Sequence, residues 1–300
     1  GTGGNISLNV FDSINITGFG TGELRLSSGI VTATDANATT GVVGRGDAGN
    51  ITVNTDSFRV ADGGLVSSQT LNDSDGGSVS ISADNFAAIN GGQVATSAAS
   101  SGNAGDINIR AADRVLLSGT EPSFADRLAE FDDIVGNEAP GNSGFFANVR
   151  ADASGEGGNI RVVAGQLDIA DGAEIDVSAA GTGVAGSLSI DAQDITLDKG
   201  SLNAETRVGN QGNISLNNVD TLLLRNNSQI TTNAAAQATG GYISIDSEGI
   251  AALDNSDITA NAVRGQGGNI QIMTQRIFSE PDSQITAASE LGIDGTVTLN

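Results

Sequence analysis

One short pattern repeats along the whole sequence, and it limits the possible folds more than any other feature. A glycine is followed by a polar residue and then by two aliphatic residues separated by one position, as in Gly49-Asn50-Ile51-Thr52-Val53. The leading glycines are Gly4, Gly49, Gly77, Gly105, Gly158, Gly186, Gly212, Gly241, Gly268 and Gly295. Seven of the nine intervals span 26 to 29 residues, which indicates coils of roughly 27–28 residues. The other two, 45 and 53 residues, predict insertions in the first and fourth coils.

Aliphatic residues within each unit alternate with polar ones, which is the period of a β-strand and not of a helix. In the unit that begins at Gly158 they form three pairs, Ile160/Val162, Leu167/Ile169 and Ile175/Val177. Three short strands per unit predict a triangular coil, and stacked coils hydrogen-bond strand to equivalent strand. We therefore predict an all-β fold, a right-handed parallel β-helix (β-solenoid) of about ten coils. Residues 1–300 are expected to form a single segment of a longer solenoid, because neither end carries a capping element.

The corners of the predicted coils support the same interpretation. Gly or Asn recurs between the second and third strands, as at Gly63, Gly91, Gly172, Asn227 and Asn255. These residue types accept positive φ at low cost, so we expect a left-handed turn in every coil. Asn follows the leading glycine in five of the ten units, which predicts a stacked amide ladder.

Composition excludes several classes of function. Thirteen Lys and Arg against 36 Asp and Glu give a net charge of −23, which argues against nucleic acid as a partner because phosphate binding needs a basic surface. The absence of His and Cys excludes a Ser-His-Asp triad, a thiol nucleophile, a disulfide framework and most zinc sites. Aromatic residues make up only 3% of the chain, which suits a narrow interior filled by aliphatic side chains.

The region 119–157 departs most from the repeat, and we interpret it as an inserted lateral loop. A short helix is predicted over 123–135, with Phe124, Leu128 and Phe131 on one face. These three residues, with Phe145 and Phe146, are the candidate partner-contact loop. The alternative is that the phenylalanines only cover one flank of the coil stack.

Arg45-Gly46-Asp47 is an integrin-type tripeptide and the second, weaker candidate for a binding site. Gly-Asp and Gly-Asn pairs are ordinary corner residues elsewhere in this chain, for example at Gly102-Asn103. A structural role at a corner is therefore the favoured interpretation of the tripeptide.

The acidic residues do not predict catalysis. Asp168, Asp176, Asp191 and Asp194 alternate with aliphatic residues, as solvated strand positions do. A glycan lyase needs a base beside a cationic group, and a glycoside hydrolase needs two facing carboxyls about 5 to 9.5 Å apart, and the sequence concentrates neither. We predict no enzyme activity, no catalytic residue, no cofactor and no defined metal site. Weak, non-stoichiometric calcium binding is expected, because stacked coils bring carboxylates together.

The Gly-Asn-Ile-x-Ile units, residues 166–179 and the closing residues 282–300 resemble the repeat region of filamentous haemagglutinin-like exoproteins of two-partner secretion systems, particularly the large cyanobacterial ones. The resemblance covers nearly the whole chain. It implies a right-handed β-helix that crosses the outer membrane through a dedicated β-barrel transporter, recognised through a separate N-terminal domain. It also implies a secreted or outer-cell-surface location and a role in adhesion.

We therefore expect an adhesin-type structural β-helix whose loops attach to a surface glycan or a cell receptor. One alternative is a purely structural spacer, surface-layer or filament component that associates laterally. The other is a polysaccharide-active β-helix enzyme, which a groove lined by Arg and Asp would favour.

Overall fold

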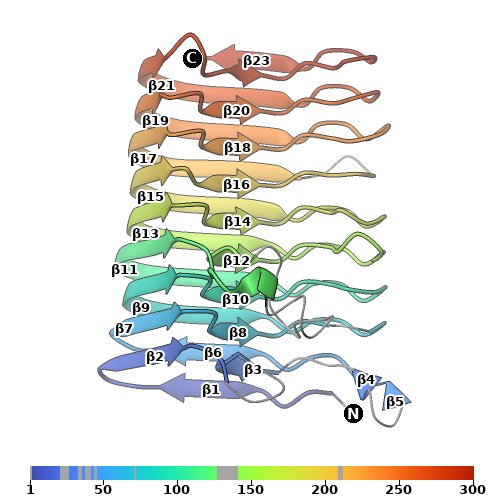
Figure 1. Cartoon of the computed structure of the whole chain (residues 1–300). Coiled ribbons are helices and arrows are strands. Elements are labelled where there is room, and N and C mark those ends of the chain that lie inside the picture. The colour runs from blue at the N-terminus through green and yellow to red at the C-terminus, as the bar shows by residue number, and fades with distance from the viewer. Residues whose placement is uncertain are drawn as a thin grey trace.

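The structure, a computed structural model, describes residues 2–20, 27–32, 36–37, 42–43, 46–70, 72–126, 141–208 and 212–300. It is an all-β solenoid of about 8 turns whose parallel strands stack along one axis (Figure 1). The chain runs leftward at the back and rightward at the front of Figure 1 while it climbs from N to C, so the coil is right-handed. The fold predicted from the repeat is confirmed.

Two parallel sheets run the length of the stack. The larger has twelve strands, ten of them in one continuous row. That row is β1 (Ile6–Asn9), β6 (Ile51–Asn54), β9 (Val79–Ile89), β11 (Ile107–Ser118), β13 (Ile160–Ala170), β15 (Ser187–Asp198), β17 (Asn213–Arg225), β19 (Tyr242–Ala252), β21 (Asn269–Ser279) and β23 (Thr296–Leu299), and β2 (Ser13–Thr17) and β7 (Ser57–Ala61) complete the sheet.

The smaller sheet is formed by the third strand of each coil. Its nine strands are β3 (Gly29–Val31), β8 (Leu65–Ser67), β10 (Gln93–Ala95), β12 (Gly144–Phe146), β14 (Glu174–Asp176), β16 (Ser201–Asn203), β18 (Gln229–Thr231), β20 (Asp257–Thr259) and β22 (Ile285–Thr286). A separate antiparallel pair, β4 (Ala36–Asn37) and β5 (Val42–Val43), lies outside both sheets. Ten first strands were predicted, and the ten are present.

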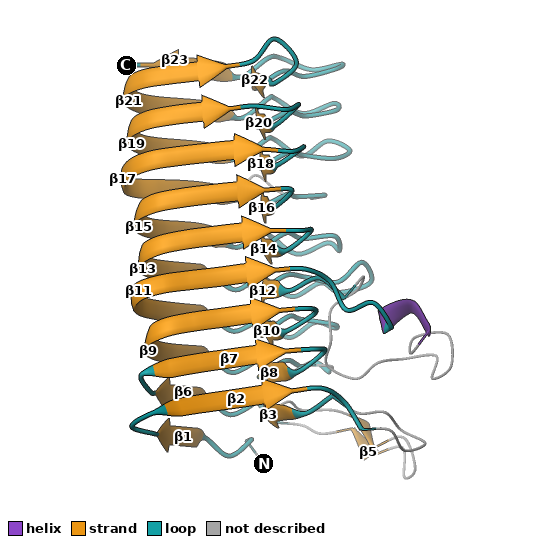
Figure 2. Ribbon diagram, turned by 60° about the vertical axis from the view of Figure 1, so that its left-hand side comes forward, coloured by secondary structure: helices purple, strands orange, loops and turns teal. Residues whose placement is uncertain are grey.

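The first two strands of most coils are fused into one bent strand, whereas the sequence predicted two separate strands. In β13 the bend falls where Gly165 and Gln166 both face outward between the inward Ala164 and Leu167. Only Gly165 is unpaired in the ladder with β15, because the pairing stops at Ala164 and resumes at Gln166. A corner this tight does not interrupt the hydrogen bonding, so each long strand contributes two faces of the coil (Figure 2).

The interior is one continuous aliphatic core. Equivalent inward positions carry Ile, Val or Leu in successive coils, as at Ile107, Ile160 and Leu188, and all three are almost fully buried. Aromatic rings enter this core near the N-terminal end, where Phe58 stacks on Phe86 with ring centroids 5.5 Å apart. Aligned aliphatic columns bury apolar area in every coil, which accounts for a folded chain with so few aromatic residues.

The predicted left-handed turn is present in six coils. Asp62, Asn90, Asp171, Lys199, Asn226 and Asp254 have φ between 49° and 58°. The equivalent place in the last such turn is Pro281, whose ring fixes φ near −65° and so excludes this turn type.

The asparagines that follow the leading glycines bind the backbone of the next coil, in place of the stacked side-chain amides that the sequence predicted. Asn50 donates its backbone N–H to Oδ1 of Asn5 at 2.8 Å, and Ser78 does the same to Asn50 one coil later at 2.8 Å. Asn159 and Asn213 accept from the next coil at 3.0 and 3.1 Å. The side-chain oxygens therefore bind the following backbone and extend the ladder into the corner.

The insertion in the fourth coil leaves the stack after β11 and returns before β12. Thr120 bridges Asn142, and the N–H of Glu121 donates to the carbonyl of Gly141 at 2.9 Å, so the two ends are held together. Its helix begins at Phe124 and is described as far as Asp126 (Figure 2). The rest of the predicted helix lies outside the described residues. The part of 119–157 that follows Asn142 rejoins the coil through β12.

The leading glycines form a column in which successive coils touch backbone to backbone. A Cβ on Gly105 would lie 2.0 Å from the carbonyl oxygen of Gly77, and one on Gly77 would lie 2.2 Å from that of Gly49. The same contact recurs at 1.9 Å from Gly158 to Gly105. No side chain fits at these distances, so the repeat requires glycine there.

We expect Gly105→Ala to lower the free energy of unfolding by about 1–3 kcal/mol or more, because the added methyl forces two coils apart. The matched control is Gly249→Ala, whose Cβ would meet nothing closer than 3.8 Å. Urea denaturation followed by circular dichroism measures both. Equal stability of the two variants would contradict the steric explanation.

Candidate functional site

A long open groove follows the first corner of the coils, where the strands of the larger sheet bend. Its volume is about 1150 Å³, and seven consecutive coils line it, from Asn9 at one end to Asp220 at the other. Six rung steps of about 4.8 Å make the groove about 29 Å long, parallel to the solenoid axis. Its position follows from the repeat, because every coil bends at this place, although β11 and β17 carry one extra residue at the bend.

Small side chains form the floor of the groove. Ala83, Ala111 and Ala164 occupy the last inward position before the bend, and each is at most 8% exposed. Gly165 and Ala112 continue the floor on the outer side of the corner. Because no bulky side chain rises from these positions, the bend stays open as a trough.

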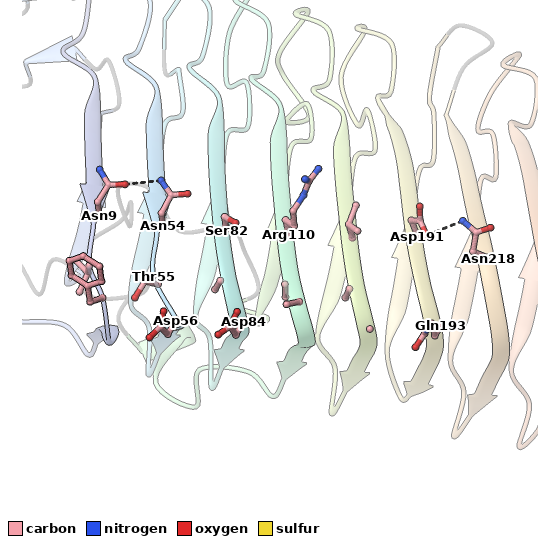
Figure 3. A pocket seen from close by; sticks show the side chains of 18 of the residues that line it. Asn9, Asn54, Thr55, Asp56, Ser82, Asp84, Arg110, Asp191, Gln193 and Asn218 are labelled. Atoms are coloured by element: carbon pink, nitrogen blue, oxygen red, sulfur yellow. Dashed lines mark hydrogen bonds between the residues drawn. The ribbon is translucent and has the colours of Figure 1, made fainter.

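The two rims of the groove differ in chemistry (Figure 3). One rim carries amide, hydroxyl and guanidinium groups, and the other carries mainly carboxylates. The first includes Asn9, Asn54, Ser82, Arg110 and Asn218, with one acid, Asp191, and the second includes Asp56, Asp84, Gln193 and Asp220. Such rims offer donors and acceptors in alternation to a polar ligand.

Hydrogen bonds along the amide rim fix some of its side chains. Nδ2 of Asn54 donates to Oδ1 of Asn9 at 2.9 Å, and Nδ2 of Asn218 donates to Oδ1 of Asp191 at 3.1 Å. Each bond joins neighbouring coils (Figure 3). The rim is therefore partly ordered before any ligand binds.

Phe11 lies at the N-terminal end of the groove and is 95% exposed. Val10 beside it is also exposed and lines the same groove. An exposed aromatic ring in a polar groove offers a flat apolar surface to a ligand.

A second hollow of about 350 Å³ adjoins the groove on the flat face before the bend. It shares Asn54, Ser82 and Arg110 with the groove and adds Asn108 and Arg161. The polar surface therefore extends sideways at the middle coils.

The predicted partner-contact phenylalanines lie mostly in the interior. Phe145 is fully buried, and its ring meets Phe86 edge to face at a centroid distance of 5.2 Å. Phe146 faces the opposite side of β12, where it packs with Leu65 and is 1% exposed. Phe124 is 4% exposed, and a Cβ on Gly141 would lie 2.5 Å from its ring.

These placements match the alternative interpretation, in which the phenylalanines cover or fill the coil stack. Leu128 and Phe131 lie outside the described residues, so partner contact through them stays a prediction.

The tripeptide Arg45-Gly46-Asp47 is described only in part, because Arg45 lies outside the described residues. Gly46 is buried. Oδ1 of Asp47 accepts the backbone N–H of Asp75 at 3.1 Å, and its carbonyl accepts the N–H of Gly3 at 2.7 Å. Asp47 thus joins successive coils at a corner, as the structural interpretation requires.

Hydrogen bonds lower the pKa of three carboxyls on the outer corners. Asn90 donates to Asp62 at 3.0 Å, Ser101 to Asp73 at 2.7 Å, and Asn226 to Asp198 at 2.6 Å, and each bond holds the pKa of its carboxyl below the usual range. Arg225 also pairs with Asp198, at 2.7 Å.

Glu205 is the opposite case. Loss of surrounding water raises the pKa of its carboxyl, although Thr231 donates to it at 3.0 Å. None of these four carboxyls lines the groove.

Among the described residues, no three Asp or Glu side chains converge to form a metal site. Weak, non-stoichiometric calcium binding by the stacked coils stays a prediction. Within the same ranges, no helix has the length and apolar character needed to cross a membrane.

Comparison with known proteins gives no relative, since no family model, no curated protein and no solved structure matches the chain. The fold and the repeat define the chain as a parallel β-helix repeat protein.

Acid is expected to reduce the stability that Asp198 provides. Because the pKa of Asp198 is lower in the folded chain than the usual value of about 3.9, its ionised form stabilises the fold above that pH and the benefit disappears as pH falls through the folded pKa. Asp198→Asn should therefore melt at a lower temperature than the parent chain at pH 7, with the difference shrinking below pH 4.

Asp194→Asn is the control for that measurement, because Asp194 is an exposed carboxylate of the same strand. Thermal melts of the three chains from pH 7 to pH 2.5 provide the comparison. A difference between Asp198→Asn and the parent that stays constant with pH would contradict the explanation.

Proposed function

We propose that the chain is an adhesive rod that binds an extended oligosaccharide in the groove at the first corner. The observation that supports this most is the continuity of the groove across seven coils, with small residues on the floor and polar groups on both rims. A linear ligand with a regular repeat matches a surface that itself repeats at every rung.

The chemistry of the rims suits sugar hydroxyls. Each hydroxyl both donates and accepts hydrogen bonds. Asn54 and Ser82 on one rim and Asp56 and Gln193 on the other supply complementary groups. Phe11 supplies an apolar face of the kind on which the C–H face of a sugar ring packs. Together these groups favour a carbohydrate over an apolar ligand.

The rod itself supports an adhesive role. Ladders join every coil to the next through both sheets, so the groove is held on a rigid framework (Figure 1). Preorganised sites lose little conformational entropy on binding. The resemblance noted above is consistent with a secreted or outer-surface location and with export through an outer-membrane transporter, which we include in the proposal.

The proposal treats the chain as a binding protein without catalytic activity. A purely structural spacer differs from it in one respect, because its groove would bind nothing. A polysaccharide-active enzyme differs in another, because bound oligosaccharide would be shortened. Both alternatives are outcomes of the experiment below.

Ala112→Trp is expected to abolish oligosaccharide binding, because Ala112 is exposed on the groove floor and an indole there fills the trough. Binding is measured on an oligosaccharide array and then by titration calorimetry with the strongest ligand. Ala288→Trp is the matched control, since Ala288 is also exposed but lies outside the groove.

Loss of binding in Ala112→Trp alone supports the proposal. Failure of the parent chain to bind any oligosaccharide would favour the spacer, and shortened products after incubation would favour the enzyme. Binding that survives in Ala112→Trp but is lost when residues 127–140 are replaced by a Gly/Ser linker would assign adhesion to the insertion instead.

A further inference from the structure

Two arginines without ionic partners lie together on the surface beside the groove. Arg110 and Arg161 are both exposed and line the same hollow of about 350 Å³. Within the described ranges, neither side chain forms an ion pair or a hydrogen bond. In a chain with 36 acidic and 13 basic residues, two neighbouring unpaired cations are unexpected.

Two other arginines on the same sheet form close ion pairs, whereas Arg276 forms none within the described residues. Arg114 meets Asp168 at 2.6 Å, and Arg225 meets Asp198 at 2.7 Å. Both pairs join neighbouring coils, so one aspartate close to the arginine on an adjacent coil is enough to form the ion pair. Directly opposite Arg110, the neighbouring coils carry Ser82 and Val163. Asp191 lies diagonally from Arg161 on the next coil, but within the described residues the two form no ion pair.

The register brings the two arginines toward each other. Arg161 in β13 pairs with Asn108 in β11, two positions before Arg110 on the same face. Such diagonal neighbours lie about 7–8 Å apart at their backbones, within reach of long side chains. In Figure 3 the side chain of Arg110 leans from β11 toward β13 and toward the beginning of the strand, which is the side of Asn108.

Neutral hydrogen-bonding groups surround the pair. Asn108, Ser80 and Thr52 line the same hollow. An arginine binds a carboxylate or sulfate through a planar fork of two N–H groups. The hollow therefore combines two forks with an amide and hydroxyls, which is suited to one tetrahedral or planar anion.

The opposite rim limits how much negative charge a ligand can carry. Asp56 and Asp84 stand on successive coils across the groove, and Asp220 stands further along. A ligand with an anion on every sugar would be repelled by this rim, whereas one anion beside the arginines avoids it.

We propose that Arg110 and Arg161 form an anion subsite that binds one carboxylate or sulfate group of an otherwise neutral oligosaccharide. The subsite rests on the proposed function and defines its ligand class more closely. It confers a preference for singly charged glycans over both neutral and fully charged ones.

The test compares four forms of one β-linked gluco-oligosaccharide by titration calorimetry at low and high salt. The first is neutral, the second has a single internal uronate, the third has a single internal sulfate, and the fourth is oxidised to a uronate at every sugar. The variants are Arg110→Gln and Arg161→Gln, with Arg276→Gln as control because Arg276 is exposed and lies outside both hollows.

The singly charged forms should bind the parent chain about tenfold or more tightly than the neutral form. Arg161→Gln should lose that advantage while keeping its affinity for the neutral form, because Arg161 lies outside the groove. Arg110→Gln should also lose the advantage, and Arg276→Gln should keep both affinities. Added salt should weaken only the charged forms. The comparison of uronate with sulfate shows which anion the subsite prefers.

Equal affinity for neutral and singly charged forms would overturn the subsite while leaving the glycan-binding groove in place. Tightest binding of the fully oxidised form would also overturn it. If none of the forms binds, the proposed function fails and the subsite with it, so the two failures are distinguishable.

Discussion

The structure depends on how closely successive coils approach each other at the leading glycines. A Cβ at Gly77, Gly105 or Gly158 would lie 1.9 to 2.2 Å from a carbonyl oxygen of the preceding coil. The absence of a Cβ at these positions lets the coils approach to the spacing that the hydrogen-bonded ladders of both sheets require. The aliphatic columns then pack without adjustment, because equivalent side chains are translated along one axis.

Polar side chains satisfy the backbone N–H groups at the corners, where the sheets are interrupted and a backbone partner is lacking. Asn50 and Asn159 bind the following backbone at the corner that precedes the first strand of each coil. Buried hydroxyls do the same near the left-handed turn, where the N–H of Ser228 donates to Oγ of Ser256 and the N–H of Ser256 donates to Oγ of Ser283, both at 3.0 Å. Asparagine and serine also line the groove on the outer face, as at Asn54 and Ser82. The residue type alone therefore does not separate residues that bind the backbone at corners from those proposed to bind a ligand.

The sequence was sufficient to predict the coil, the place of its strands and its left-handed turns, because each depends on local periodicity and on residue types that tolerate one backbone conformation. The asparagine ladder was predicted as stacked amides, whereas the side chains bind the backbone of the next coil. The strand Gly144–Phe146 was harder to find, since neither residue after the glycine is polar and the alternation disappears when both sides of a strand are buried. The groove was missed because it depends on the tightness of the first corner. Consecutive outward residues such as Gly165 and Gln166 were its only signal.

A repeat gives a ligand the same contacts at every rung, and this provides affinity but no fixed position along the axis. Position requires a rung that differs from its neighbours. Val163 and Arg161 occupy places where adjacent coils have Arg110 and Asn108, or Asp191 and Ser189. Over these three coils the charged side chains change from cationic, at Arg110 and Arg161, to acidic, at Asp191, which makes the middle of the groove distinct from its ends. In the proposed function, departure from the repeat at these coils, and not the repeat itself, sets the register of the oligosaccharide.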